Sequence, residues 1–354
     1  MVLAMEWSVC SSSMTSAAVA AEPRTAENPI RRGATEDRIL KFMKLWVPSA
    51  DAVELMGPLP DEVDVVVVEH GQPLPKGGEE VEFVVPSWMD KVAVAAMLPH
   101  LTNLKVVQVL NAGYDWVTPL VDDTVTICNA GDANAAAVAD WCAAAILTEL
   151  RLFPTFARQQ IRHTWAVRAG KPVSAHTIGI LGYGAIGKSL HERLRPFGCT
   201  VVPIASRARE AIHGVDELAV LLPSLDVLVC LTPLTDATHG LVNAEMLALM
   251  RNGSTVVNAG RGAVVDTEAL LAELVSGRLR AVLDVTDPEP LPADHALWDA
   301  PNVRITPHVA GATTSFFAFT YPVVAQNVHR YLAGEPLTNV VQGPLFQPRA
   351  VRFD

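Results

Sequence analysis

The 354-residue sequence has few cysteines, more acidic than basic residues and no long apolar run. Its cysteines are scattered and form no CxxC pair, which argues against a disulfide framework and a zinc site: Cys10, Cys128, Cys142, Cys199 and Cys230. The 27 basic and 38 acidic residues leave a net charge of −11, which disfavours a nucleic-acid or anionic-membrane surface. No apolar run approaches the roughly 20 residues that cross a bilayer. We therefore expect a cytoplasmic protein that binds neither nucleic acid nor membrane.

The first 42 residues differ in composition from the rest of the chain. The stretch SVCSSSMTSAAVAAEPRTAENP is rich in serine, alanine and threonine and lacks hydrophobic periodicity. No basic region precedes an apolar one, so a secretory signal is disfavoured, while organellar targeting remains an alternative. We expect residues 1–42 to be a disordered extension, or an over-long start ahead of Met43.

From Met43 onward, short apolar segments alternate with helical patterns. Valine-rich segments such as VDVVVVEHG and GSTVVNAGRG are typical of parallel strands that are covered on both faces. Residues 132–151 predict a long alanine-rich helix, and NAEMLALM and DTEALLAELVSG predict helices between later strands. The alternation predicts an α/β fold with doubly wound sheets and right-handed crossovers. A last helix is expected in SFFAFTYPVVAQNVHRYLAG, where Pro322 should kink or break it.

The segment GYGAIGKS at residues 182–189 matches two phosphate-binding patterns, GxGxxG and GxxxxGK[ST]. Both place phosphates on backbone N–H groups at a helix N-terminus. The strand IGIL directly before Gly182 favours a dinucleotide site. There Gly182 makes the tight turn, Gly184 permits close backbone approach and Gly187 lets the helix pack on the strand. The alternatives are a nucleotide-triphosphatase loop and a glycine turn without a ligand.

The end of the next strand bears on the choice of cofactor. An NAD site usually carries Asp or Glu there to hold the adenosine ribose, but TVVPIAS ends at Ser206 and Arg207. A guanidinium in place of the carboxylate suits the additional phosphate of NADP(H). If Arg207 and Arg209 are merely solvated charges, NAD(H) is the cofactor instead. The sequence therefore favours NADP(H), with NAD(H) as the alternative.

Polar residues follow three later strands of the predicted sheet. Arg261 lies in NAGRGAVVD, Glu289 in DVTDPEPLP and His308 in ITPHVAG. Ligands of open α/β sheets collect at the carboxyl ends of strands, so these side chains could converge on one cleft. Each also has a structural explanation: Arg261 as a turn cap, Glu289 as an exposed charge and His308 as a packed histidine.

Several ordered motifs together resemble the D-isomer-specific 2-hydroxyacid dehydrogenase family. They include LKVVQVLNAGYDWV, GILGYGAIGKSL, LTPLTDATHGLVNAEMLALM, NAGRGAVVDTEALLAEL, LDVTDPEPLP and HALWDAPNVRITPHVAG, and they cover roughly Met43 to Val341. The resemblance implies that His308 is the general acid/base and that Glu289 pairs with it and stabilises its charged form. It implies that Arg261 grips the substrate carboxylate and polarises the carbonyl.

The resemblance also implies where substrate and cofactor bind. The backbone of Asn111, Ala112 and Gly113 would bind the substrate carboxylate, and Asp284 would orient the nicotinamide carboxamide. Hydride would pass directly from the nicotinamide to the substrate, so no metal is required. With the glycine turn and the strand ends, the expected cofactor-binding residues are Gly182, Gly184, Ala185, Ile186, Gly187, Ser206, Arg207, Thr232, Pro233, Asn258, Ala259, Gly260 and Asp284.

The implied architecture has two Rossmann-like or flavodoxin-like doubly wound domains. The substrate domain is discontinuous, with residues 43–133 and a returning segment at 310–345, while residues 134–309 form the dinucleotide-binding domain and 346–354 a tail. A homodimer through the cofactor domains is implied as well. Such an arrangement permits hinge closure over the cleft.

The substrate is expected to be a small 2-keto or 2-hydroxy acid. Phosphoglycerate and phosphite dehydrogenases are alternatives within the superfamily, whereas Glu289 in place of a glutamine disfavours formate dehydrogenase. An alternative of another class is a corepressor-like protein that uses the dehydrogenase fold as a nucleotide-gated binding module.

Overall fold

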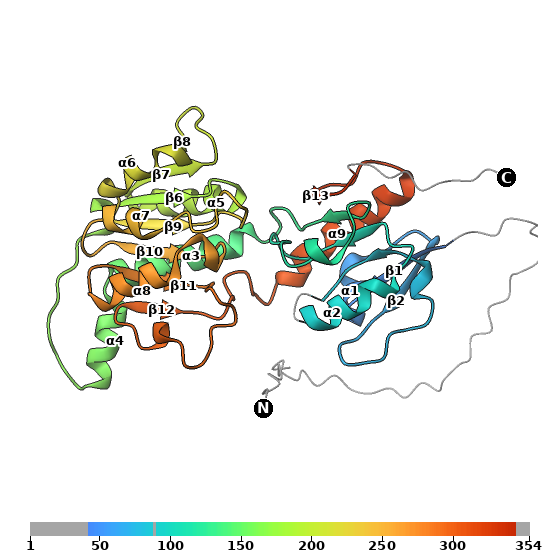
Figure 1. Ribbon diagram of the computed structural model, residues 1–354, viewed down its shortest axis with the longest axis horizontal. Coiled ribbons are helices and arrows are strands. Elements are labelled where there is room, and N and C mark those ends of the chain that lie inside the picture. The colour runs from blue at the N-terminus through green and yellow to red at the C-terminus, as the bar shows by residue number, and fades with distance from the viewer. Residues whose placement is uncertain (1–41, 88–89, 345–354) are drawn as a thin grey trace, which may run out of the picture. The chain divides into compact units, whose positions relative to one another are not determined.

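The computed structural model describes residues 42–87 and 90–344 (Figure 1). The expected disordered extension, apart from its last residue, and the C-terminal tail lie outside the described residues. In the described part of the chain, no helix is long and apolar enough to cross a membrane. The chain forms two β-sheets flanked by helices, so the fold is α/β as predicted.

The first sheet has the strand order β13-β5-β4-β3-β1-β2 within the described residues. Strands β1 to β5 are parallel, and the order 2-1-3-4-5 is flavodoxin-like. The sixth strand, β13, comes from the C-terminal end and pairs antiparallel with β5, so the substrate domain is discontinuous as predicted. The bounds are β1 Met43–Val47, β2 Val63–Val67, β3 Val81–Val84, β4 Val106–Gln108, β5 Thr126–Cys128 and β13 Val340–Gln342.

The second sheet has the order β12-β11-β10-β9-β6-β7-β8, and its paired strands are all parallel. Counted from β6, this is the 3-2-1-4-5-6 order of a dinucleotide-binding fold with one strand added. The order reverses between β6 and β9, where ligands of such sheets bind. The bounds are β6 Thr177–Leu181, β7 Thr200–Ala205, β8 His213–Gly214, β9 Val227–Cys230, β10 Thr255–Asn258, β11 Arg280–Leu283 and β12 Val303–Ile305.

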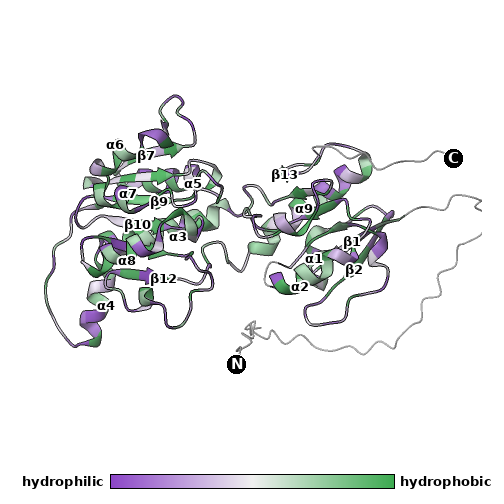
Figure 2. Cartoon of the chain, in the orientation of Figure 1, coloured by the Kyte–Doolittle hydropathy of each residue, from purple (hydrophilic) through white to green (hydrophobic). Residues whose placement is uncertain are grey.

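Helices cover both faces of the sheets, and the strands between them are apolar. In Figure 2 the central strand β9 is hydrophobic, whereas α4 is largely hydrophilic. The strands β6 and β9 are almost entirely buried, as expected of valine- and isoleucine-rich parallel strands. The bounds are α1 Ala50–Met56, α2 Lys91–Met97, α3 Ala135–Leu150, α4 Phe153–Ile161, α5 Ala185–Leu194, α6 Leu218–Leu221, α7 Ala244–Leu249, α8 Thr267–Val275 and α9 Phe316–Ala333.

Helix α9 returns the chain to the first sheet and passes through Pro322 without a break. Of the kink or break expected at Pro322, the break is therefore wrong. The proline lacks the N–H of one helical hydrogen bond, which costs roughly 3 kcal/mol. The apolar face of α9 outweighs this cost, because Tyr321, Val324 and Val328 are fully buried in the same core cluster as Met43 of β1.

Candidate active site

The turn after β6 is built around Gly182, which has φ of +106°. A Cβ atom added to Gly182 would lie 2.7 Å from the carbonyl carbon of Leu231 and 2.8 Å from the nitrogen of Thr232. Only glycine tolerates this combination of φ and contact. The turn therefore brings the end of β6 against the end of β9, at the point where the strand order reverses.

The other two glycines of the motif separate the two phosphate-binding interpretations. A Cβ atom on Gly187 would lie 2.5 Å from the carbonyl oxygen of Gly182, so this glycine permits helix–strand packing. Space is open around Gly184, which begins α5 without a side-chain cap. Since α5 starts at Ala185, Ser189 lies inside the helix, where Arg193 Nη1 donates to its Oγ at 2.6 Å. The geometry is that of a dinucleotide turn and lacks the longer loop of a nucleotide triphosphatase.

The neighbouring strand ends fit a dinucleotide. The Oγ1 atom of Thr232 is buried and has no hydrogen-bond partner among the described residues, as expected of a group that awaits a ligand. A Cβ atom on Gly260 would lie 2.8 Å from the carbonyl oxygen of Thr232, so the backbones after β9 and β10 approach closely. Ser206 and Arg207 are exposed at the end of β7. Together with the uncapped start of α5, these features suit a bound dinucleotide.

The turn that presents Arg261 is shaped by a buried asparagine. Asn258, the last residue of β10, is 1% exposed. Its side-chain amide donates to the carbonyl oxygen of Arg261 at 2.9 Å, and its Oδ1 accepts from the backbone N–H of Gly260 at 3.1 Å. These two hydrogen bonds fix the backbone from which the Arg261 side chain extends.

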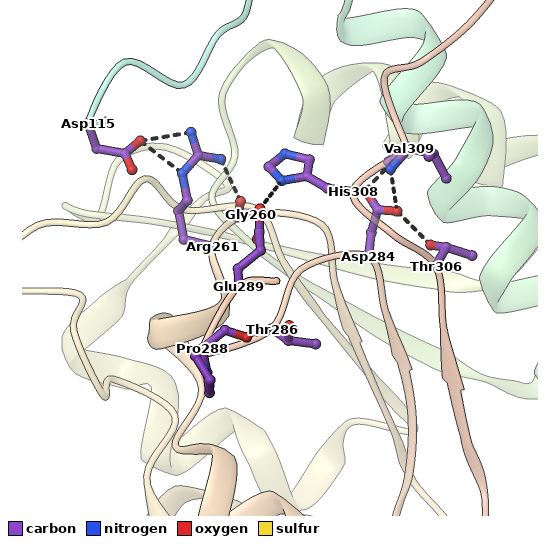
Figure 3. A network of polar contacts seen from close by, with 11 residues as sticks. Asp115, Gly260, Arg261, Asp284, Thr286, Pro288, Glu289, Thr306, His308 and Val309 are labelled. Carbon is purple, nitrogen blue, oxygen red and sulfur yellow. Dashed lines mark hydrogen bonds and ion pairs between the residues drawn. The ribbon is translucent and has the colours of Figure 1, made fainter. Parts of the chain in front are cut away.

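The Arg261 guanidinium lies against the loop after β4, where the substrate-binding backbone was predicted. Its Nε and Nη2 atoms both donate to Asp115 Oδ1, at 2.9 and 2.8 Å, and Nη1 donates to the carbonyl oxygen of Gly260 at 2.8 Å (Figure 3). A Cβ atom on Gly113 would fall 1.3 Å from Nη2, so the close approach requires glycine at this position. Arg261 and Gly113, which lie far apart in the sequence, are thus in contact.

The loop that carries the predicted carboxylate-binding backbone is itself held in place. The side-chain amide of Asn129 donates to the carbonyl oxygen of Ala112 at 2.7 Å, and the N–H of Ala130 donates to that of Asn111 at 3.2 Å. Two carbonyl groups of the loop are therefore satisfied by protein. The N–H groups of Asn111, Ala112 and Gly113 make no hydrogen bond within the described residues.

His308 and Glu289 form the predicted pair. The distance from His308 Nδ1 to Glu289 Oε1 is 2.7 Å, and Figure 3 shows the imidazole directed at the carboxylate. Burial raises the pKa of the Glu289 carboxyl, but the hydrogen bond and charge of His308, with the charges of Lys91 and Arg261, outweigh burial. The pKa of Glu289 consequently lies below its ordinary value, and the carboxylate is ionised at neutral pH.

Asp284 holds the loop from which His308 projects. Its carboxylate is 2% exposed and accepts hydrogen bonds from Thr306 Oγ1 at 2.5 Å and from the N–H groups of Val309 and Ala310 at 2.9 and 2.8 Å. His308 itself has φ of +55°, an unfavourable conformation for a residue with a side chain. The bonds to Asp284 secure this conformation, a contribution that the sequence pattern did not indicate.

The structure thus brings together Arg261, Glu289 and His308 from three strand ends of the second sheet, since the Arg261 charge also acts on Glu289. The residues predicted for the cofactor lie at the ends of β6, β7, β9, β10 and β11 of the same sheet. Sequence reasoning assigned no role to Asp115, although it lies two residues after Gly113 in the same loop. The only sequence signal is an acidic residue at the carboxyl end of a predicted strand.

Comparison with known proteins gives a consistent result. Residues 143–310 match the family model described as "D-isomer specific 2-hydroxyacid dehydrogenase, NAD binding domain". A glyoxylate/hydroxypyruvate reductase of Arabidopsis thaliana is 31% identical over 256 residues, which cover 70% of this chain and 79% of that protein.

Solved structures extend the similarity to almost the whole of their own chains. A D-isomer specific 2-hydroxyacid dehydrogenase from Xanthobacter autotrophicus Py2, in complex with NADPH and MES, aligns with a TM-score of 0.72 and 30% identity. The match covers 85% of this chain and 98% of that one. An NADPH-dependent glyoxylate/hydroxypyruvate reductase from Sinorhizobium meliloti, in complex with NADP and sulfate, aligns with a TM-score of 0.74 and 27% identity over 84% and 98% of the two chains. The chain belongs to the D-isomer specific 2-hydroxyacid dehydrogenase family of NAD(P)-dependent oxidoreductases.

Proposed function

We propose that the protein interconverts a small 2-keto acid and its D-2-hydroxy acid, with His308 and Glu289 as the acid–base pair and Arg261 as the carboxylate anchor. The observation that carries the proposal is the 2.7 Å contact between His308 and Glu289 beside Arg261. The reduction of a keto acid requires a proton donor and a fixed cation close together, and both lie at the carboxyl ends of the strands of the second sheet.

The proton step follows from the orientation of the imidazole. Nδ1 faces the Glu289 carboxylate and carries a proton toward it, so Nε2 is the nitrogen left to exchange a proton with the substrate. During reduction, Nε2 donates its proton to the keto oxygen, and in the reverse direction it accepts the hydroxyl proton. The ionised Glu289 stabilises the charged imidazolium before the transfer.

Substrate binding rests on Arg261 and the loop after β4. A guanidinium binds a carboxylate through two parallel N–H···O bonds, and the N–H groups of Asn111, Ala112 and Gly113 add donors from the loop. The arrangement fixes the 2-keto group relative to His308. The proposed substrate is therefore a small 2-keto or 2-hydroxy acid, and direct hydride transfer requires no metal ion.

The cofactor is NADP(H) by preference, with NAD(H) as the alternative. The bound nicotinamide supplies the hydride to the substrate carbon. Ser206 and Arg207 end β7 where a carboxylate would mark an NAD site, and a relative with 30% identity was solved with NADPH. Gly182, Gly184, Ala185, Ile186 and Gly187 would hold the phosphates, and Thr232, Pro233, Asn258, Ala259, Gly260 and Asp284 would line the remainder of the groove.

The proposal includes two domains, with residues 43–133 and 310–345 forming the substrate domain and 134–309 the cofactor domain. The two segments where the chain crosses between them lie side by side, because the side-chain amide of Asn134 donates to the carbonyl oxygen of Gly311 at 2.9 Å. Such adjacent crossings suit a hinge. We also propose a homodimer and a cytoplasmic location.

The experiment is a turnover assay of the purified protein with NADPH or NADH against glyoxylate, hydroxypyruvate, pyruvate and longer 2-keto acids. We expect absorbance loss at the nicotinamide band with at least one acid, and a lower KM for NADPH than for NADH. Tight cofactor binding without turnover of any acid would refute the enzymatic proposal and favour the nucleotide-gated binding protein. A lower KM for NADH would overturn only the cofactor preference.

A further inference from the structure

A carboxylate occupies one edge of the Arg261 guanidinium. Asp115 Oδ1 accepts from Nε at 2.9 Å and from Nη2 at 2.8 Å, so a single oxygen bridges these two nitrogens. The carbonyl oxygen of Gly260 accepts from Nη1 at 2.8 Å. A guanidinium has five N–H bonds, and these contacts use three of them. One N–H on Nη1 and one on Nη2 make no hydrogen bond within the described residues and remain for another ligand.

We propose that Asp115 is a positioning residue that holds the Arg261 fork so that its remaining Nη1 and Nη2 donors face the substrate carboxylate. The inference rests on the proposed role of Arg261 as the carboxylate anchor and adds the group that orients it. An arginine side chain carries about 2 kcal/mol of rotamer entropy, which must be lost when it binds a ligand. A fork that is ordered in advance has already lost that entropy, so the substrate binds more tightly.

The loop around Asp115 is suited to hold a side chain in one place. Gly113 lies at the Nη2 end of the guanidinium, where an added Cβ atom would lie 1.3 Å from Nη2, 2.5 Å from Cζ and 3.0 Å from Nη1. Asn129 and Ala130 hold the carbonyl groups of Ala112 and Asn111. The guanidinium therefore meets a fixed backbone at its Nη2 end and a carboxylate on its Nε–Nη2 edge.

The carboxylate is charged under working conditions. Burial raises the pKa of the Asp115 carboxyl, but the hydrogen bond and charge of Arg261, with a smaller contribution from Lys91, bring the pKa below its ordinary value. The side chains of Asp115 and Arg261 are 40% and 22% exposed, so solvent partly screens the attraction. Geometry, more than net charge, is then the main contribution of Asp115.

The test compares two substitutions at this position in the full-length protein. Asp115→Asn retains an acceptor oxygen for Nε and Nη2 but removes the charge, whereas Asp115→Ala removes both. We expect Asp115→Ala to raise KM for the keto acid, and Kd for the unreactive carboxylate oxamate, roughly 10- to 100-fold through misplacement of the fork. Asp115→Asn should stay within about threefold of wild type, because a neutral hydrogen bond retains much of the geometry. The Kd for NADPH should be unchanged in both variants, and their loss of stability should be modest, because both side chains of the ion pair are partly exposed.

A matched control removes a nearby charge that does not contact Arg261. Asp123 is exposed in the segment between β4 and β5, and Asp123→Ala should leave KM, Kd for oxamate and stability at wild-type values. Wild-type KM and Kd for oxamate in Asp115→Ala would overturn the positioning role. So would equal losses in Asp115→Asn and Asp115→Ala, since charge alone would then explain the effect.

Arg261→Ala distinguishes this inference from the function on which it rests. If Arg261→Ala leaves Kd for oxamate unchanged, the proposed carboxylate anchor fails. If Arg261→Ala weakens oxamate binding but Asp115→Ala does not, only the positioning role fails. If both weaken it, the double variant should bind oxamate no more weakly than Arg261→Ala alone. A further loss in the double variant would mean that Asp115 acts independently of Arg261, which contradicts the proposal.

Discussion

Two glutamates, Glu289 and Glu149, lie near opposite ends of the strands of the second sheet. Glu289 follows the carboxyl end of β11 and contacts His308 at 2.7 Å. Glu149, in α3, lines a cavity of about 640 Å³ with residues at the amino ends of the strands, among them Thr255 and Arg280. Both carboxylates have positively charged neighbours, so the comparison shows how the distance to such a neighbour affects the pKa of a carboxyl group.

The two carboxyl groups have pKa values displaced in opposite directions. Burial raises both, but at Glu289 the hydrogen bond and charge of His308 outweigh burial and lower the pKa. At Glu149, burial prevails over the charges of Arg304, Arg280 and Arg158, and the pKa is raised. The nearest of these cations, Arg304 Nε, lies 3.9 Å from Glu149 Oε1, which makes no hydrogen bond within the described residues. A direct hydrogen bond, more than the number of nearby cations, decides the direction in which the carboxyl pKa moves.

Among the predicted changes, we expect the largest effect from His308→Asn, at the carboxyl end of the strands of the second sheet, where it should lower kcat. Loss of the proposed general acid should reduce kcat by roughly 10²- to 10⁴-fold, because the asparagine amide cannot take over the proton transfer proposed for the imidazole. Cofactor binding should persist, since the glycine turn lies at another strand end. Initial rates and a fluorescence titration with NADPH check both parts. Turnover at the wild-type rate in His308→Asn would refute the acid–base assignment.

Two glycines with positive φ offer a second contrast between the ends of the sheet. Gly182→Ala would combine a φ of +106° with a contact of 2.7 Å to Leu231, for an expected loss of about 2–5 kcal/mol in unfolding free energy. Its cofactor Kd should rise as the turn shifts. Gly253, at the amino end, has φ of +84° but open space around it, so Gly253→Ala should cost only about 1–2 kcal/mol.

Urea unfolding and NADPH titration of the two alanine variants measure these differences. Gly253→Ala is the matched control, because it adds the same methyl group in a left-handed conformation away from the cofactor turn. Equal losses of stability and unaltered NADPH affinity in both variants would contradict the steric account of Gly182.

These contrasts also indicate which features a sequence can predict. The valine runs predict the buried strands, and the strand before Gly182 predicts its turn, because these signals are local. The sequence patterns do not indicate strands β5 and β13, and β13 is placed by its antiparallel pairing with β5, which lies far away in the sequence. Of the kink or break expected at Pro322, the break does not occur, because tertiary packing of α9 outweighs the local preference.

Among the site residues, too, those placed by local sequence signals were predicted, and the one placed by a long-range contact was not. Arg261, Glu289 and His308 each follow a predicted strand, so the topology of the sheet places them near one another. Asp115 lies 146 residues from Arg261 in the sequence, and no spacing rule connects them. The pKa values of Glu289 and Glu149 move in opposite directions because of their distances to side chains on other helices and strands. Sequence periodicity carries no information about these distances.

The lowered pKa of Glu289 predicts an acid-side loss of stability. A carboxyl with a folded-state pKa below its unfolded value of about 4.3 stabilises the protein above that pH, and the contribution is lost as the pH falls through the folded-state pKa. Wild type should therefore exceed Glu289→Gln in unfolding free energy at neutral pH, and the difference should vanish in acid. With a side chain that is 34% exposed, the difference is expected to be modest. Urea unfolding between pH 3 and 7 checks it, and a pH-independent difference would contradict the ion pair.

The smallest effect is expected from Glu149→Gln, with the opposite slope. A carboxyl with a raised folded-state pKa binds its proton more tightly in the folded than in the unfolded protein. The wild type should therefore lose stability relative to Glu149→Gln as the pH rises from about 4.3 to the folded-state pKa of Glu149, and the difference should be constant above it. Urea unfolding of the two proteins across pH 4–8 at one salt concentration measures the slope. A gain of wild-type stability over this range would mean that the arginines compensate the Glu149 charge fully, and the contrast with Glu289 would then disappear.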